Sequence, residues 1–126
     1  MLRAMGTAVE PLVRKLNVVY LYVSDMERSL HFYRDVLGVP LAGDADWQEA
    51  QLGGARFALH RAHDGVGHLS SGTIHVDLEV ANLELAAERL AAAGIKMGAA
   101  MREDWGAALE IIDPDGYRLY LFEAPA

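Results

Sequence analysis

Residues 18–30 read VVYLYVSDMERSL, and residues 75–87, at an offset of 57, read HVDLEVANLELAA. Apolar residues match along both copies, and the polar residues Asp25 and Asn82 occupy equivalent positions. In each copy, alternating apolar residues give way to apolar residues at helical spacing, which is typical of a strand followed by a helix. The repeat therefore predicts two copies of one structural unit.

A second repeat, at an offset of 62, places RFALHRA (56–62) over RLYLFEA (118–124). Each stretch follows a glycine-containing turn, so we expect both to be closing strands. Two more strands fit before each closing strand, at about 40–43, 46–52, 96–101 and 107–112. Each half is then a βαβββ module. We expect an α+β protein with two curled mixed sheets around a concave cavity and one helix on the outer face of each module.

Both predicted helices carry start or stop signals. Ser24 and Glu27 fit the S-x-x-E capping box, Gly38 ends the first helix, and Gly94 ends the second. Apolar residues at helical spacing indicate the buried faces: Met26, Leu30, Tyr33 and Leu37 in the first helix, and Leu83, Ala87 and Leu90 in the second.

The length of 126 residues fits a single domain, residues 1–126. Within it we place module one at about 16–62 and module two at about 73–124. The stretch between them, about 63–72, is polar and rich in Gly and Ser, so it is expected to be a linker.

Composition excludes several classes of function. The chain has no cysteine, which rules out disulfides, zinc-thiolate sites and thiol nucleophiles. A formal net charge of -7 argues against nucleic acid as a partner, because such binding needs a basic face. No apolar run is long enough to cross a membrane or to resemble a signal peptide, so we expect a soluble, cytoplasmic protein with no membrane partner.

Two motifs carry a family resemblance. VSDMERSLHFYRDVLGV (23–39) opens the first module, and DPDGYRLYLFE (113–123) closes the second. With two tandem βαβββ modules, the chain resembles the vicinal oxygen chelate superfamily, which includes glyoxalase I, extradiol dioxygenases, fosfomycin-resistance enzymes and bleomycin-resistance proteins. The resemblance covers residues 17–123, nearly the whole chain. It implies a concave cavity that, in the enzymes, holds a divalent metal acting as a Lewis acid.

The resemblance also assigns four metal-ligand positions, on the first and closing strand of each module. They fall here on Val18, Ala58 (or Leu59 one register along), His75 and Tyr120. His75 alone matches the family pattern, and a catalytic metal typically needs about three protein ligands. We therefore expect no metal and no cofactor. A rebuilt site, in which His60 and His75 join Glu79 or Glu110, is the alternative, and the linker histidines His63 and His68 could contribute to it.

Strand alternation predicts which side chains share the concave faces. Many of them are aromatic or charged, and aromatic faces bind planar or cationic groups. The predicted ligand-binding residues are Tyr20, Tyr22, Trp47, Arg56, His60, His75, Asp77, Glu79, Trp105, Glu110, Tyr120 and Phe122.

This lining resembles the bleomycin-resistance branch of the superfamily, whose members sequester a cationic, heteroaromatic drug at a dimer interface. The resemblance implies a metal-independent protein that binds an aromatic or cationic small molecule or antibiotic, and it implies a homodimer. Two enzymatic alternatives stay open. One is a metal-dependent lyase, isomerase or dioxygenase rebuilt around His75. The other is metal-free acid–base catalysis with His75 as base and Tyr120 as an oxyanion donor.

Overall fold

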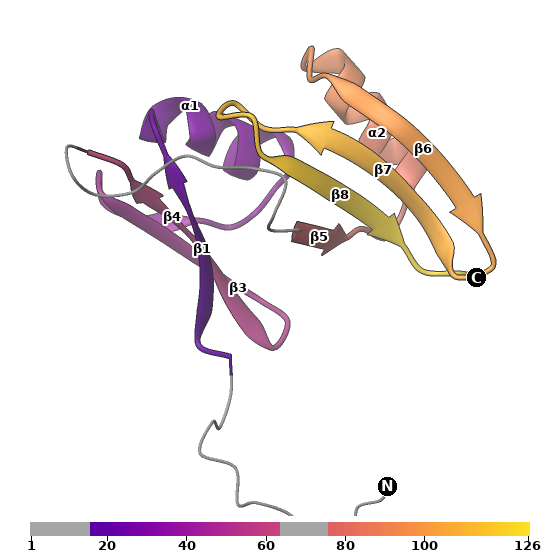
Figure 1. The fold of residues 1–126 in the computed structure, drawn as a ribbon, viewed down its shortest axis with the longest axis horizontal. Helices are drawn as coiled ribbons and strands as arrows, with labels where there is room; N and C mark the ends of the chain where they lie inside the picture. The colour runs from indigo at the N-terminus through magenta and orange to yellow at the C-terminus, as the bar shows by residue number, and fades with distance from the viewer. Residues whose placement is uncertain (1–15, 64–75) are drawn as a thin grey trace, which may run out of the picture.

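The computed structural model describes residues 16–63 and 76–126, which form two four-stranded sheets and two helical segments (Figure 1). The first sheet has the order β1-β4-β3-β2 and the second β5-β8-β7-β6. The strands are β1 (Val18–Val23), β2 (Ala42–Gly43), β3 (Trp47–Leu52), β4 (Ala55–Arg61), β5 (Val76–Glu79), β6 (Met97–Glu103), β7 (Gly106–Ile112) and β8 (Arg118–Glu123). Two tandem α+β modules are therefore present, as the sequence predicts.

Strand pairing repeats from one sheet to the other. In the first sheet β1 runs parallel to β4, and β3 is antiparallel to both β4 and β2. The second sheet has the same pattern, with β5 parallel to β8 and β7 antiparallel to both β8 and β6. Tyr20 lies opposite Ala58, and its repeat equivalent Asp77 lies opposite Tyr120. The two repeat offsets of the sequence therefore agree with the strand pairing, because Tyr20 and Asp77 are 57 residues apart and their partners Ala58 and Tyr120 are 62 residues apart.

The helix of the first module begins at a different cap from the one predicted. The α1 helix (Met26–Leu30) has Asp25 as its N-cap, and the Asp25 carboxylate accepts a 3.1 Å hydrogen bond from the backbone N–H of Arg28. The predicted capping box at Ser24 is wrong, because the Ser24 hydroxyl and backbone N–H both donate to the carboxylate of Asp115 instead. An aspartate at this position serves the same role as the serine.

The α1 helix continues as a π-helix, η1 (His31–Val36). The backbone N–H of Leu37 donates to the carbonyl of Phe32 at 3.0 Å, which closes the wider turn. The wider turn brings Phe32 and Val36 to the buried face together with Tyr33, and of these three only Tyr33 belongs to the stripe that the sequence predicts. Gly38 then ends the segment with a φ of 81°, a conformation that favours glycine.

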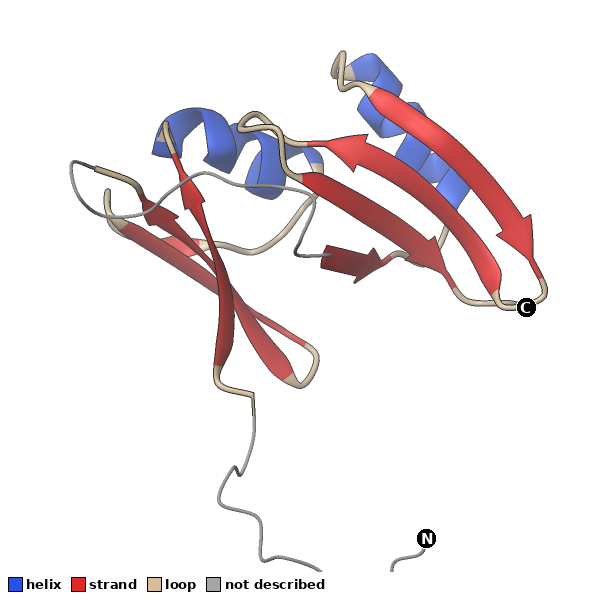
Figure 2. Ribbon diagram, in the orientation of Figure 1, coloured by secondary structure: helices blue, strands red, loops and turns tan. Residues whose placement is uncertain are grey.

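The second helix, α2 (Leu83–Ala92), has Asn82 as its N-cap, and the Asn82 side chain accepts from the backbone N–H of Leu85 at 2.9 Å. A second acceptor comes from the last strand, since the Glu123 carboxylate accepts from the backbone N–H of Leu83 at 2.6 Å. Both helices lie on one side of the sheets, and no helix of the described residues lies on the opposite faces (Figure 2). We call these opposite faces the open faces.

The hydrophobic core lies between the helices and the sheets and runs through both modules. Its strand residues alternate with the residues of the open faces: Leu21 and Val23 are buried, whereas Tyr20 is 42% exposed. The largest fully buried side chains are Tyr33, Phe32, Leu59, Leu90, Ile111, Leu119 and Leu121. Within the described residues, no helix is long and apolar enough to cross a membrane.

Candidate functional site

The open face of the first sheet presents three rows of side chains. The strand register places Tyr22 and Trp47 on either side of His60. The next row is Tyr20, Ala58 and Glu49, and the third is Val18, Arg56 and Gln51. All five residues that the sequence predicts here for ligand binding therefore share one face: Tyr20, Tyr22, Trp47, Arg56 and His60.

Four of these side chains form an aromatic cluster, defined as Tyr20, Tyr22, Trp47 and His60. The Tyr20 ring lies 5.2 Å from that of Trp47 and 5.6 Å from that of Tyr22, both edge to face. The His60 ring lies 5.0 Å from Tyr22 and 5.8 Å from Trp47. These centroid separations are those of favourable aromatic pairs, so the cluster forms a connected aromatic surface.

Trp47 is held by a carboxylate that sequence reasoning missed. Its indole Nε1 donates to Glu49 Oε1 at 2.7 Å, and Arg56 donates to the same oxygen at 2.8 Å. The indole hydrogen bond, followed by the Arg56 guanidinium, lowers the pKa of Glu49. Glu49 lies two residues from Trp47 on the same strand face, which is the signal that could have identified it.

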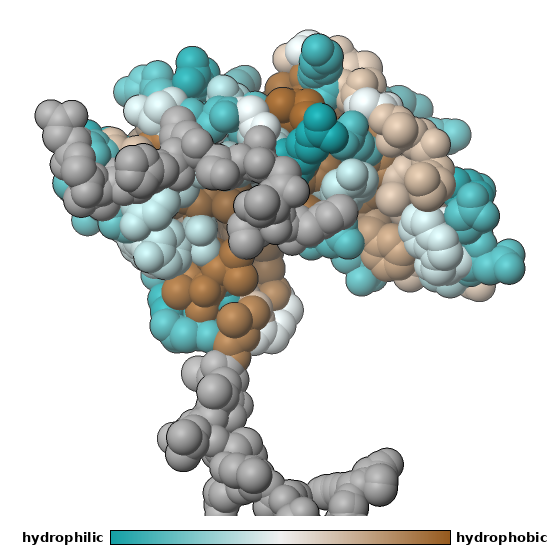
Figure 3. Space-filling view, viewed as in Figure 1, coloured by the Kyte–Doolittle hydropathy of each residue, from teal (hydrophilic) through white to brown (hydrophobic). Residues whose placement is uncertain are grey.

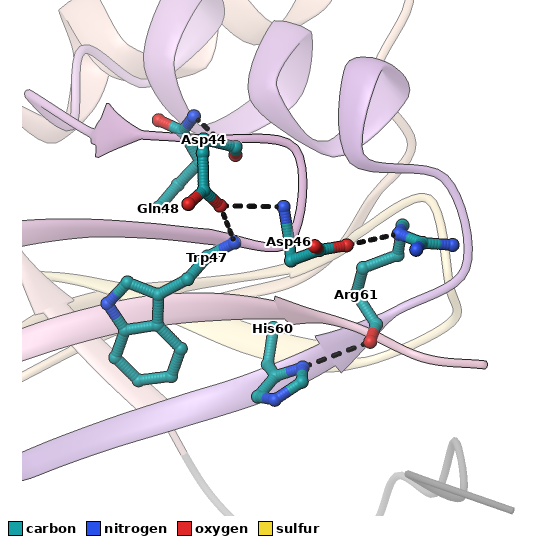
Figure 4. A network of polar contacts seen from close by, with 6 residues as sticks. All are labelled: Asp44, Asp46, Trp47, Gln48, His60 and Arg61. Atoms are coloured by element: carbon teal, nitrogen blue, oxygen red, sulfur yellow. Dashed lines mark hydrogen bonds and ion pairs between the residues drawn. The ribbon is translucent and has the colours of Figure 1, made fainter.

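The turn before β3 fixes the backbone of Trp47 (Figure 4). The Asp44 carboxylate accepts from the backbone N–H groups of Asp46 and Trp47, each at 2.9 Å, and these bonds lower the pKa of Asp44. Asp46 in turn pairs with Arg61 at 2.8 Å. The Trp47 and His60 rings project from neighbouring strands on the same side of the sheet (Figure 4). The aromatic cluster is therefore built on strands rather than on a loop.

The open face of the second sheet holds a pocket of about 340 Å³. The rings of Trp105 and Phe122 both line it, and they stack with a centroid distance of 6.2 Å and an interplanar angle of 21°. The Tyr120 hydroxyl and the Arg118 guanidinium each donate to Glu110 Oε2 at 3.4 Å. The lining residues are Asp77, Ala99, Met101, Trp105, Ala108, Glu110, Tyr120 and Phe122. Five of them are predicted ligand-binding residues.

The structure thus brings the predicted residues together as two groups, one on each sheet. Glu79 lines a different pocket, next to the first module. His75 and His68 lie outside the described residues, so the predicted role of His75 stays a prediction. His63 is exposed at the end of the described part of the first module.

The family's metal-ligand positions do not fit a metal in this chain. Val18 and Ala58 lie on the open face of the first sheet, where neither side chain has a donor atom, and Ala58 is fully buried. Tyr120 lies on the second sheet, beside Glu110. Across residues 16–63 and 76–126, no three His, Asp or Glu side chains are placed to hold a metal ion. The rebuilt site joins His60 and His75 with Glu79 or Glu110, and because His75 lies outside the described residues, this alternative stays a prediction.

The fold and these faces define a class of protein: two tandem βαβββ modules whose open sheets carry aromatic and acidic side chains. The model of the Glyoxalase/Bleomycin resistance protein/Dioxygenase superfamily matches residues 15–121. The chain belongs to this superfamily, as its motifs predict. No curated protein sequence matches the chain significantly.

Several solved structures share the fold. An antibiotic binding protein from Streptomyces sp. CB03234, TnmS3, has a TM-score of 0.74 at 19% identity, over 92% of this chain and 100% of its own. Lactoylglutathione lyase from Agrobacterium tumefaciens has a TM-score of 0.70 at 19% identity, over 90% and 96%. The fosfomycin resistance protein FosX from Mesorhizobium loti has a TM-score of 0.67 at 14% identity, over 92% and 95%. At these identities the similarity shows the fold alone.

Proposed function

We propose that this protein binds a planar aromatic, cationic small molecule on its open sheet faces, without a metal. The pocket of the second sheet carries the proposal. It combines stacked Trp105 and Phe122 rings with the carboxylates of Asp77 and Glu110. Aromatic faces attract planar and cationic groups, and carboxylates favour a positive charge.

The size and charge of the pocket support this ligand class. Its volume of about 340 Å³ lies in the range of small-molecule sites, which runs from roughly 300 to 1,000 Å³. The net charge of -7 adds a long-range attraction for cations. A neutral aromatic ligand would gain the stacking but not the electrostatic energy.

Two further parts of the proposal concern the identity of the ligand and the assembly. TnmS3 is described as an antibiotic binding protein, and this supports an antibiotic as the ligand here as well. A homodimer is supported by large side chains left exposed on the open faces, namely Tyr20, Met101 and Trp105, which are 42%, 52% and 48% exposed. Figure 3 also shows hydrophobic surface over the lower end of the first module.

The test is a calorimetric titration with acridine orange, a planar aromatic cation, against anthracene sulfonate as an anionic aromatic control. We expect acridine orange to bind, and Trp105→Ala to weaken its binding about tenfold or more, because a stacking surface is lost. Trp47→Ala, which removes the indole of the other sheet, is the matched variant and should leave the second-sheet site intact.

Two results would contradict the proposal. Equal affinities for acridine orange and anthracene sulfonate would mean that the carboxylates of the pocket do not favour a positively charged ligand. Stoichiometric retention of Zn, Ni, Mn or Fe after metal loading, abolished by His75→Ala, would instead establish a metal-dependent member of the superfamily.

A further inference from the structure

A second and larger pocket, of about 510 Å³, lies between the two modules. We call it the inter-module groove. One wall is the end strand of the second sheet, β5, with the residue that follows it, and the other is the first module. The lining residues are Leu37, Gly38, Val39, Leu52 and Gly53 from the first module, and Asp77, Leu78, Glu79, Val80 and Leu121 from the second.

The groove is apolar along its walls and acidic at one place. Four aliphatic side chains are only half-buried and so present surface to the groove: Leu37, Leu52, Leu78 and Val80. Asp77 and Glu79 are exposed and lie two positions apart on β5, so they share a strand face. At Gly53, where the backbone turns with a φ of 60°, an added Cβ would meet no atom within 4 Å, so this end of the groove is open.

Asp77 lines both the inter-module groove and the pocket of the second sheet. The register explains how one residue reaches both. β5 is the end strand of its sheet, and Asp77 lies opposite Tyr120, a wall of the second-sheet pocket. The carboxylate of Asp77 therefore stands where the two pockets adjoin.

We propose that one ligand occupies both pockets. Its planar aromatic part stacks with Trp105 and Phe122, its positive charge lies beside Asp77, and an apolar arm extends from the charged atom into the inter-module groove. This inference rests on the proposed function and names the ligand class more closely, as an aromatic cation with an aliphatic arm.

An apolar arm fits the inter-module groove better than a polar or an anionic arm would. Leu37, Leu52 and Val80 would leave a polar arm without hydrogen-bond partners, which costs free energy. An anionic arm would be repelled by the carboxylates of Asp77 and Glu79, which line the groove. Burial of each added methylene contributes favourably, so affinity should rise with arm length until the groove is full.

The experiment compares acridine orange with nonyl acridine orange, the same ring carrying an aliphatic arm on its charged nitrogen. Binding to the full chain is measured by calorimetry below the concentration at which the dyes aggregate. We expect the armed dye to bind about tenfold more tightly or better. Shorter alkyl arms on the same ring should give intermediate affinities, and this series needs no variant of the protein.

Leu52→Asn tests the location of the arm. We expect it to reduce the advantage of the armed dye to less than about threefold, with the affinity for acridine orange unchanged. Leu16→Asn, which removes an aliphatic side chain that is 62% exposed and outside the groove, is the matched control and should preserve the advantage. Circular dichroism confirms that each variant is folded.

The outcomes separate the two proposals. If acridine orange binds and the arm adds nothing, the proposed function stands and the two-pocket ligand is wrong. If neither dye binds, the proposed function itself fails. If the arm adds affinity that Leu16→Asn abolishes and Leu52→Asn does not, the arm adheres to the surface and the groove is not its site.

Discussion

The hydroxyl of Tyr33 donates a 2.7 Å hydrogen bond to Asp113 Oδ2, across 80 positions of sequence. Tyr33 lies in η1 of the first module, and Asp113 lies in the turn between β7 and β8 of the second. The other oxygen of Asp113 accepts from the backbone N–H groups of Asp115 and Tyr117. The buried carboxylate of Asp113 therefore accepts hydrogen bonds within its own turn and also links that turn to the first module.

Tyr33→Phe should destabilise the protein by about 1–3 kcal/mol, because it leaves one oxygen of a buried carboxylate without its donor. Urea unfolding measures the change. The control is Leu85→Ala on the surface of α2, where the side chain is 57% exposed and the cost should stay within about 0.5 kcal/mol. Equal effects of the two substitutions would mean that the Tyr33–Asp113 bond does not stabilise the fold.

The same carboxylate should give stability a defined pH dependence. Burial raises the pKa of Asp113 above its ordinary 3.8, although hydrogen bonds from Tyr33 and the turn oppose the shift. A raised folded-state pKa means that folding favours the protonated acid, so this contribution is complete below about 3.8 and is lost as the pH rises through the folded-state pKa. The stability of wild type relative to Asp113→Asn, measured by urea unfolding, should therefore fall as the pH rises above about 3.8. If the stability of wild type relative to Asp113→Asn rises with pH instead, folding lowers the pKa of Asp113 and does not raise it.

The helix cap provides a separate test. Asp25→Ala should cost about 1 kcal/mol, since it removes the acceptor for the backbone N–H of Arg28. Glu27→Ala, which removes the side-chain acceptor of the S-x-x-E pattern, should cost far less. Thermal unfolding of the two variants decides between the caps, and a larger loss for Glu27→Ala would restore the capping box.

The fold could be predicted because its signals are local and repeated. Alternation in β1 and β5 and the two offsets predicted two copies of one module, and the strand register agrees, since Tyr20 lies opposite Ala58 and its equivalent Asp77 lies opposite Tyr120. Each pairing supports the other, so an error in one module would have appeared in its copy. The open faces follow from the same alternation.

What the sequence could not predict depends on partners distant in the chain. Ser24 fits a local capping pattern, but its partner is Asp115, 91 positions away. Tyr33 was predicted as part of an apolar stripe, and nothing nearby indicates that its hydroxyl reaches Asp113. The separation of the site residues into two sheet faces also depends on how the modules pack, which no single strand pattern encodes.

Glu49 should control the orientation of the Trp47 indole. Its pKa lies below the ordinary 4.5 because the indole N–H and Arg56 favour the ionised form, so these contacts persist above that value and are lost as the pH falls through the lowered pKa. In a Trp105→Phe background, where Trp47 is the remaining tryptophan, emission should shift in this acid range. Glu49→Gln should remove the shift, and an unchanged titration would mean that another group reports on Trp47.

Gly106 should be needed for the stack of Trp105 on Phe122. Its φ of 131° disfavours any side chain, and an added Cβ would lie 2.5 Å from the carbonyl oxygen of Glu123 and 2.8 Å from the Phe122 ring. Gly106→Ala should therefore cost about 1–3 kcal/mol of backbone strain and push the Phe122 ring out of its place. In a Trp47→Phe background we expect a red shift of Trp105 emission and weaker binding of acridine orange. Gly54→Ala is the matched control, since its Cβ would meet nothing within 4 Å, and it should change neither quantity. If Gly106→Ala lowers stability while emission and affinity stay at their wild-type values, Phe122 keeps its place without the glycine, and the stack does not depend on this close approach.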